Sequence, residues 1–402
     1  MGRRDGLCGC VRSPVLRLGS GATRRRAPAI TLALVSWLAT LAAPTLGLAQ
    51  SDPVIQKIVK TWKDREDRIR SFRIEWKEKV LWVAGSVAKP APGAGDLLFP
   101  KEDVIQDYQR SLLVEGARVR YEIDGVEASN CSDIVGFLKC RTKSAFDGKN
   151  SKSFWDYEDK ALHYPSGRVH PVSGLFDARE IATIPPLLAM RALHQEWTTV
   201  NLREYRPAQE VMVIDGEKCI ALTFRGGPDE EERIYLAPQR EYLPLRKERR
   251  WKGRTTSVWK VSFRDDHQHG WLPAAWEVAE FRSDGTFSEH RTSVVTSCAV
   301  NVPVRGEDFK IEFPEGTWVY DGLTKESYIQ LSDGDNRRIV PGEKGKYADF
   351  LATKSGALLP RDRPRGAWAY VLVGIPLVVL AWMAVALARR RWSRSGGGPA
   401  AR

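Results

Sequence analysis

Metal-ion binding is the chemistry best matched by one short run of neighbouring side chains, namely Asp265, Asp266, His267 and His269. On a strand, His267 and His269 would point to the same face, and imidazole and carboxylate groups are common zinc ligands. However, Gly270 follows at once, and a polar run that ends in glycine is typical of a hairpin turn. No third strong ligand lies nearby in the sequence, so we expect a turn here and no bound metal.

Acid–base or nucleophilic catalysis would need a histidine within a recognisable frame of partners. None of the histidines lies in a nucleophile elbow or an HExxH motif, and none lies within a frame of paired carboxylates. The histidines are His163, His170, His194, His267, His269 and His290. We therefore expect a protein that is not an enzyme, with no catalytic residues and no cofactor. A hydrolase with an unusual site is the remote alternative.

Aromatic and aliphatic side chains recur at every second position in two stretches, which places them on one face of a sheet. Such a face is either an ordinary core or the lining of a cavity for an apolar ligand. Core packing is the favoured interpretation, because aromatic residues dominate cores. The candidate ligand-binding residues of a cavity are Phe72, Ile74, Trp76, Trp82, Trp259 and Phe263.

The densest run of charge away from the two ends of the chain spans Arg246 to Arg254 and includes Trp251. It could bind anionic lipid headgroups, with the indole at the membrane interface. Charge along an edge strand also prevents sheets from pairing with one another, and this second interpretation is favoured.

Four cysteines remain once the first segment of the chain is removed as an export signal, and an oxidising compartment would favour their pairing. Cys131 and Cys140 are nine residues apart across a polar segment, and Cys219 and Cys298 lie in two strand-like stretches. We expect a disulfide within each pair. None of the four lies in a CxxC motif, which argues against a metal site.

The elements that must position these residues begin with a helix. Ser51 and Asp52 precede Pro53, and a capping side chain before proline in the first turn is typical of a helix start. Apolar residues then follow helical spacing, which predicts an amphipathic helix up to about Arg70. After Arg70 the period changes to two, which predicts a long strand with one face in water.

Short strand-like segments recur beyond this strand and are separated by turn signals at Asp124-Gly125, Asp147-Gly148, Asp215-Gly216 and Asp284-Gly285. Such spacing predicts an antiparallel meander. A helical interruption is expected from about Leu175 to His194, where Pro185 and Pro186 start an apolar stripe that should lie across the sheet. The expected fold class is α+β, an antiparallel sheet with covering helices.

Two apolar segments at the ends of the chain predict its topology. Ala367 to Ala388 holds 22 residues without a charge, long enough to cross a membrane as a helix. Arginines follow it, so the last residues should remain in the cytoplasm and the bulk of the chain should lie outside. At the other end, three arginines and an apolar stretch lead to Gly47-Leu48-Ala49, which reads as an export signal cut near Ala49.

The net charge of +12 belongs to these two ends. Residues 1–49 carry +6 and residues 361–402 carry +7, which leaves −1 for the rest of the chain. A nucleic-acid-binding protein needs a basic surface on its folded part, so this class of partner is excluded.

Several short motifs occur in an order that resembles the bacterial outer-membrane lipoprotein carrier family, the LolA and LolB type. These are Phe146-Asp147-Gly148-Lys149, Phe154-Trp155-Asp156-Tyr157, Pro186 to Leu188, and the closing run from Phe309 to Gly316. The resemblance covers about residues 53 to 322. It implies a half-open antiparallel barrel, closed by helices, whose apolar interior takes up acyl chains.

A carrier that shuttles between membranes must be soluble, whereas this chain carries an expected anchor. We therefore expect a membrane-tethered binding protein for a lipid, a lipoprotein acyl chain or another apolar ligand, with a bacterial envelope location and its bulk on the periplasmic side. The alternative is an envelope sensor or protein-interaction module with the same fold. The expected divisions are a signal peptide (1–49), the LolA-like domain (50–322), an extension and stalk (323–366), the transmembrane helix (367–388) and a basic cytoplasmic tail (389–402).

Overall fold

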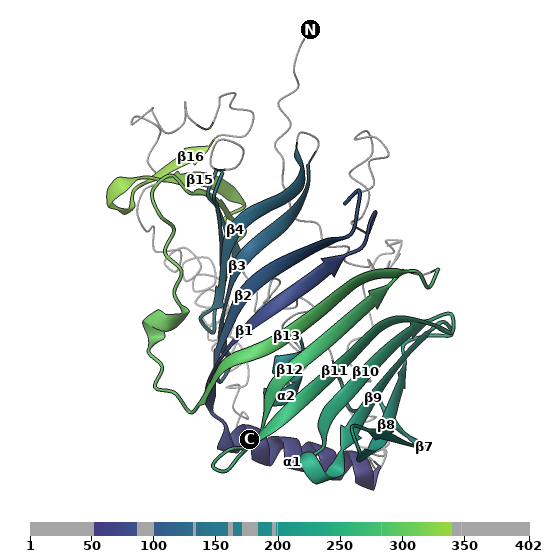
Figure 1. Cartoon of the computed structure of the whole chain (residues 1–402). Coiled ribbons are helices and arrows are strands. Elements are labelled where there is room, and N and C mark those ends of the chain that lie inside the picture. The colour runs from purple at the N-terminus through teal and green to yellow at the C-terminus, as the bar shows by residue number, and fades with distance from the viewer. Residues whose placement is uncertain are drawn as a thin grey trace, which may run out of the picture.

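The protein is described by a computed structural model. It describes residues 52–86, 100–131, 134–159, 164–170, 184–194, 198, 200–282, 284–339 and 347. Within these residues the strands form one strongly curled sheet, with helix α2 (Ile184–Met190) on its concave side and helix α1 (Pro53–Arg68) along its lower end (Figure 1). No helix of this part is long and apolar enough to cross a membrane. The predicted signal, span and tail at residues 1–49, 367–388 and 389–402 lie outside the described residues.

The first half of the sheet is a meander that begins directly after helix α1 (Pro53–Arg68). Its strands are β1 (Ser71–Trp82), β2 (Val104–Glu115), β3 (Arg118–Cys131), β4 (Ile134–Phe146), β5 (Ser151–Tyr157) and β6 (Ser166–His170). Each pairs antiparallel with the next. Helix α2 (Ile184–Met190) then separates this half from the second.

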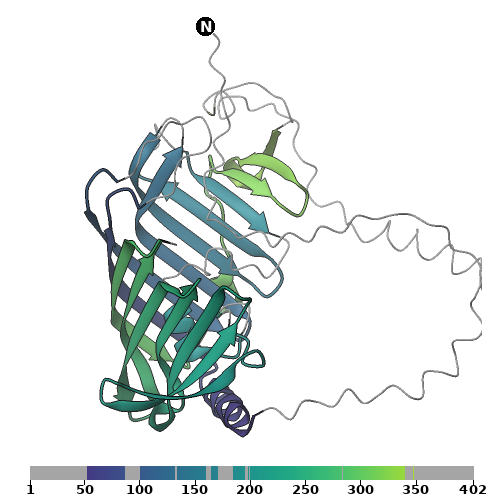
Figure 2. The ribbon, with the colours of Figure 1, turned by 90° about the vertical axis from the view of Figure 1, so that its right-hand side faces the viewer.

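The second half of the sheet is another antiparallel meander. Its strands are β7 (Arg206–Ile214), β8 (Glu217–Arg225), β9 (Glu230–Ala237), β10 (Leu243–Trp251), β11 (Arg254–Asp266), β12 (Gly270–Phe281) and β13 (Phe287–Val300). A one-turn helix, η1 (Pro238–Arg240), links β9 to β10. The last strand, β13, pairs with β1 along nearly its whole length and so joins the two meanders. The predicted meander and α+β class are confirmed (Figure 2).

After β13 the chain crosses the outer, convex side of β3 to β5. The crossing includes η2 (Gly306–Phe309) and a small cluster in which Ile311 and Phe313 pack on Ala145 and Phe154. It leads to β14 (Trp318–Asp321), which pairs parallel to its neighbour, β6. Strand β15 (Glu326–Gln330), the turn η3 (Ser332–Gly334) and β16 (Asn336–Ile339) follow.

The strands of this last part of the chain lie on both sides of the predicted domain boundary at residue 322. Because β15 pairs with β14 and β16 pairs with β15, the sheet continues across residue 322 as far as Ile339.

Helix α1 forms as the sequence predicts. The Asp52 carboxylate accepts a hydrogen bond from the Val54 N–H at 2.8 Å, and Pro53 opens the first turn. The apolar stripe buries Ile58 and Trp62 against the end of the curled sheet. The predicted second helix is shorter than expected: α2 has seven residues, and residues 171–183 lie outside the described part of the chain.

Candidate functional site

The concave face of the curled sheet is where the candidate residues gather. Along β1 the side chains alternate, so that Arg73 and Lys77 are exposed on the convex side whereas Phe72, Ile74 and Trp76 are fully buried on the concave side. The matching positions of β2, β3 and β8 to β13 supply the rest of this face.

Five of the six predicted ligand-binding residues lie in one contiguous buried cluster. Phe72, Ile74 and Trp76 come from β1, and Trp259 and Phe263 come from β11. The sixth residue, Trp82, lies outside that cluster at the far end of β1, where its ring is 5.9 Å from the Phe137 ring. The structure thus brings five of the residues together, and their contact with a ligand stays a prediction.

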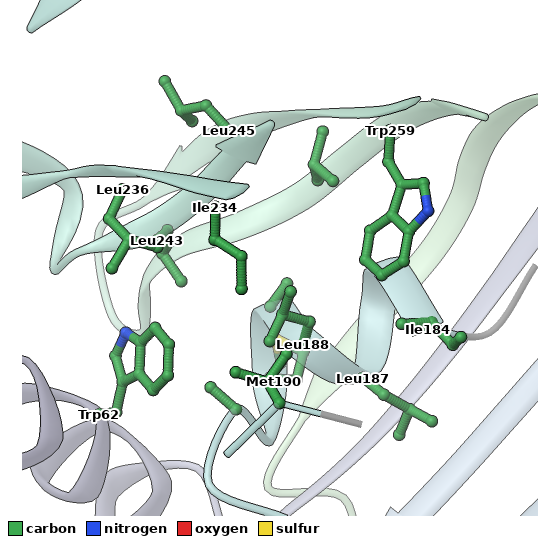
Figure 3. Close-up of a cluster of buried hydrophobic side chains, with 14 of the residues drawn as sticks. Trp62, Ile184, Leu187, Leu188, Met190, Ile234, Leu236, Leu243, Leu245 and Trp259 are labelled. Atoms are coloured by element: carbon green, nitrogen blue, oxygen red, sulfur yellow. The ribbon is translucent and has the colours of Figure 1, made fainter. Parts of the chain in front are cut away.

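Helix α2 fills the apolar part of the concavity. All seven of its residues are buried. Figure 3 shows its side chains lying between Trp62 of α1 and a wall of strand residues, which comprises Ile234, Leu236, Leu243, Leu245 and Trp259. Chain order explains this placement, because α2 lies between the two meanders and its apolar residues pack on the concave face that both meanders share.

Buried polar contacts hold α2 to α1. The Arg65 guanidinium is buried and donates to the Ala189 carbonyl oxygen at 3.2 Å and to the Glu241 carboxylate at 2.7 Å. Glu66 accepts a hydrogen bond from the Leu193 N–H at 2.9 Å. Removing α2 from the concavity would therefore break both apolar and charged contacts.

A charged cluster occupies the other part of the concave face. The Glu78 carboxylate has no exposed surface and lies 2.9 Å from Nη2 of Arg110 and 3.1 Å from Nη1 of Arg291. It also accepts a hydrogen bond from Ser293 at 3.1 Å. Burial raises the pKa of Glu78, but the two guanidinium groups outweigh it and hold that pKa below its ordinary value. Glu78 is therefore ionised at neutral pH.

Aromatic rings cover the cations of this face. The Arg110 guanidinium lies 4.8 Å from the centre of the Tyr108 ring, and Arg291 lies 5.9 Å from that of Trp82. A second buried pair extends this arrangement toward β9, where Lys247 lies 4.5 Å from the Trp259 ring and 2.8 Å from the Glu232 carboxylate. Each contact of this kind favours a charged group in a dry site.

One carboxyl group of the cluster has no cationic partner at contact distance within the part of the chain that the structure describes. Glu280 on β12 is directly opposite Glu289 on β13, and Glu289 is itself paired with Arg291. Glu280 accepts a hydrogen bond from the Ser257 hydroxyl at 2.6 Å. Burial, reinforced by the charge of Glu289, raises the pKa of Glu280 to about 7.

Two indole rings separate the charged cluster from the apolar part. Trp76 and Trp276 are both fully buried, and their ring centres are 5.2 Å apart in an edge-on arrangement. Among the described residues, neither Nε1–H has a hydrogen-bond acceptor. Their neighbour Tyr121 stacks on Trp76 at 6.2 Å and accepts a hydrogen bond from Arg110.

This charged cluster was not predicted from the sequence, although one signal for it exists. Glu78 interrupts the alternation of apolar residues at a position that must face inward, between Trp76 and Val80. A charged residue at an inward position of a strand needs buried partners. Those partners, Arg110 and Arg291, come from distant segments and become neighbours only through the strand register.

The polar run at Asp265 to Gly270 forms a turn between β11 and β12, as predicted. The Asp266 carboxylate accepts hydrogen bonds from the backbone N–H groups of Gln268 and His269. Within the described residues, no group of His, Cys, Asp and Glu side chains could hold a metal ion. The charge run at Arg246 to Arg254 lies on β10 and its turn to β11, and β10 is paired on both sides. The edge-strand interpretation of that run is therefore wrong.

The predicted disulfides do not form. Cys131 is opposite Ile134 in the β3–β4 hairpin, and Cys140 lies six residues further along β4. At about 3.3 Å per residue the two cysteines are about 20 Å apart, far beyond disulfide reach. Cys219 and Cys298 are free thiols on β8 and β13, with β9, β10, β11 and β12 between them. Both expected pairs are wrong, because adjacency in a sheet depends on register and strand order.

No protein-family model matches the chain, and no curated protein matches it. Among solved structures, it is similar to an outer membrane lipoprotein-sorting protein domain from Vibrio parahaemolyticus, with 13% identity, a TM-score of 0.36, and coverage of 64% of this chain and 97% of that one. It is also similar to a LolA superfamily protein from Nitrosomonas europaea, with 12% identity, a TM-score of 0.33, and coverage of 63% and 97%.

A protein of the DUF1329 family from Desulfovibrio piger gives 12% identity, a TM-score of 0.36, and coverage of 64% and 95%. These similarities are in line with the resemblance found in the sequence.

Proposed function

We propose that this protein binds a lipid, a lipoprotein acyl chain or another apolar ligand on the concave face of its sheet, by burial and without covalent chemistry. The observation that supports this most directly is the apolar concavity between the two meanders. Its walls come from β1 and β8 to β12, and the short helix α2 and part of α1 fill it.

Helix α2 occupies the space that an acyl chain would take. Its seven residues present Leu187, Leu188 and Met190 to the sheet, and a chain of similar length would replace those contacts with equivalent ones. Burial of each methylene is worth about 0.8 kcal/mol, and this gain would offset the apolar contacts that α2 loses. The buried contacts of Arg65 and Glu66 would set the free energy that this displacement requires.

We place this protein at a bacterial membrane, with the sheet on the periplasmic side. The support is in the sequence: the apolar segment 367–388, the arginines that follow it, and the export signal at residues 1–49. A tethered binding protein would act on ligands at the membrane surface to which it is attached.

The test is native mass spectrometry of the chain purified from the envelope without harsh detergent, followed by lipid extraction. We expect a co-purifying lipid. In Trp259→Glu, a buried charge on the concave face should remove the lipid while the circular dichroism spectrum stays unchanged. The matched control is Val294→Glu, because Val294 is 54% exposed and lies next to the inward-facing Ser293, so it points to the other face. A lipid-free wild-type protein, or a lipid retained by folded Trp259→Glu, would contradict the proposal.

A protein-interaction module is the second candidate, and strand β7 favours it. Among the described strands β7 is the last of the sheet on its side, and its Val211 and Val213 are 67% and 61% exposed. An extended peptide could add to such an edge. If Val211→Lys with Val213→Lys abolishes cross-linking to an envelope protein while lipid binding persists, this second function is supported.

A further inference from the structure

We propose that Trp76 and Trp276 form a polar subsite that receives an uncharged hydrogen-bond acceptor, the ester or amide carbonyl at the head of a bound acyl chain. This inference rests on the proposed function, because it assigns the orientation of the ligand within the same concavity. It adds a specificity that burial alone does not provide.

The two indoles lie where the apolar and the charged residues of the concave face meet. Trp76 lies between Ile74, which belongs to the apolar cluster, and Glu78, which is the centre of the charged cluster. Trp276 is directly opposite Ser293, whose hydroxyl donates to Glu78 at 3.1 Å. The two rings therefore mark the boundary between the apolar and the charged parts of the concave face. An amphiphile bound across this boundary would place its first polar group beside them.

The indole N–H groups of Trp76 and Trp276 are buried hydrogen-bond donors. A buried N–H group without an acceptor destabilises the folded state, and native structures rarely leave one unpaired. Among the described residues, both Nε1 atoms are buried and have no acceptor, whereas Trp62 shows the usual arrangement and donates to the Tyr242 carbonyl oxygen at 3.0 Å. A ligand oxygen at Trp76 and Trp276 would satisfy groups that the protein itself leaves unsatisfied.

The charges of the cluster beside the two indoles are balanced by ion pairs, and this balance favours an uncharged hydrogen-bond acceptor in the ligand. Glu78 and Glu289 balance Arg110 and Arg291 through ion pairs, so no cation of this cluster is left for an anionic ligand. Glu280, the remaining acid of the cluster, adds negative charge whenever it ionises. A carboxylate or phosphate here would be buried without a counter-charge, which is strongly unfavourable. A carbonyl oxygen meets no such penalty.

The experiment compares two probes that differ only in the carbonyl group, 1-palmitoylglycerol and 1-hexadecylglycerol. The full chain is reconstituted in nanodiscs of dialkyl-ether lipid, so that the probe supplies the only ester. Binding is measured by titration of tryptophan fluorescence. One or two good hydrogen bonds predict that the ester binds roughly 5- to 30-fold more tightly than the ether.

Indole nitrogen resonances provide a second readout that needs no substitution. In protein labelled with ¹⁵N at the tryptophan side chains, we expect the ester probe to shift two indole N–H signals downfield, and the ether probe to leave those two signals without a downfield shift. Trp76→Phe and Trp276→Phe identify the two signals if these variants fold.

Matched variants separate hydrogen bonding from packing. The ester preference is the ratio of the affinity for 1-palmitoylglycerol to that for 1-hexadecylglycerol. Trp76→Phe and Trp276→Phe should each reduce this ratio, and the double variant should bring it close to 1. Trp259→Phe removes similar volume from the same concave face but lies outside the indole pair, so it should weaken both probes equally and keep the preference.

The outcomes distinguish the two proposals. If wild-type protein binds both probes equally, with no downfield indole shift, the polar subsite is refuted and the acyl-binding function stands. If neither probe binds, the proposed function fails and the subsite fails with it. An ester preference that persists in the folded double variant would also overturn the assignment to these two indoles.

Discussion

Replacement of Glu280 by glutamine should change how the stability of the protein depends on pH. In the folded chain the pKa of Glu280 is raised from 4.5 to about 7, mainly by burial and then by the charge of Glu289 opposite it. Between these two values the folded state holds a proton that the unfolded state has released. The free energy of unfolding therefore falls as the pH rises through this range.

The size of this effect follows from the shift. Each pKa unit corresponds to about 1.4 kcal/mol, so ionised Glu280 destabilises the folded state by up to about 3 kcal/mol above pH 7. Glutamine keeps the volume and can still accept the hydrogen bond from Ser257, but it never ionises. Glu280→Gln should therefore match wild type near pH 4 and exceed it by about 2–3 kcal/mol at pH 8.

The assay is guanidinium unfolding of both proteins at a series of pH values, followed by tryptophan fluorescence. Other titrating groups, such as Glu66, contribute to both proteins and cancel in the difference. Glu277→Gln is the matched control, because Glu277 is exposed on the other face of the same strand. A stability difference between Glu280→Gln and wild type that is the same at pH 4 and pH 8 would refute the reasoning.

Three further substitutions test the packing described above. Gly167→Ala should lower the free energy of unfolding, measured by urea titration, by about 1–3 kcal/mol, because the new methyl group would lie 2.6 Å from the Phe313 ring. The control is Gly136→Ala, whose methyl group would meet no atom within 4 Å and should change the free energy of unfolding little. Arg65→Met should lower the free energy of unfolding by about 1–3 kcal/mol, which thermal unfolding measures. The buried Ala189 carbonyl oxygen loses its charged donor, whereas Glu241 is 28% exposed and keeps its ion pair with Arg68. Glu78→Gln should lower the free energy of unfolding by about 3–5 kcal/mol, since two buried guanidinium groups lose their shared carboxylate. A change below about 1 kcal/mol in guanidinium unfolding would contradict the burial of this cluster.

The elements set by local pattern could be predicted, and those set by long-range register could not. Helix α1 and its cap followed from Asp52, Pro53 and the spacing of the apolar residues. The long strand β1 followed from its alternation. By contrast, the disulfide predictions failed because closeness in sequence, or a shared strand character, does not specify which residues face each other across a sheet.

One turn signal was wrong for an instructive reason. Asp124-Gly125 resembles a hairpin turn, yet both residues lie within strand β3. A Cβ atom at Gly125 would lie 2.3 Å from the Tyr108 ring, so glycine is present here to admit an aromatic side chain from β2. Glycine within a strand often marks such a close approach. The same ring covers Arg110 of the charged cluster, which gives Gly125 a place in the candidate site that its sequence context does not reveal.

The charged cluster itself argues that the concave face is more than a core. Replacing buried ion pairs by apolar residues of similar size is often neutral or stabilising, so a face devoted to stability alone would have continued the apolar pattern of β1 through position 78. Here the chain instead buries Glu78, Arg110 and Arg291 above two indoles whose N–H groups have no acceptor among the described residues. Fixed dipoles and charges beside an apolar pocket orient a ligand that has one polar end. The arrangement supports the proposal that this face selects among amphiphiles.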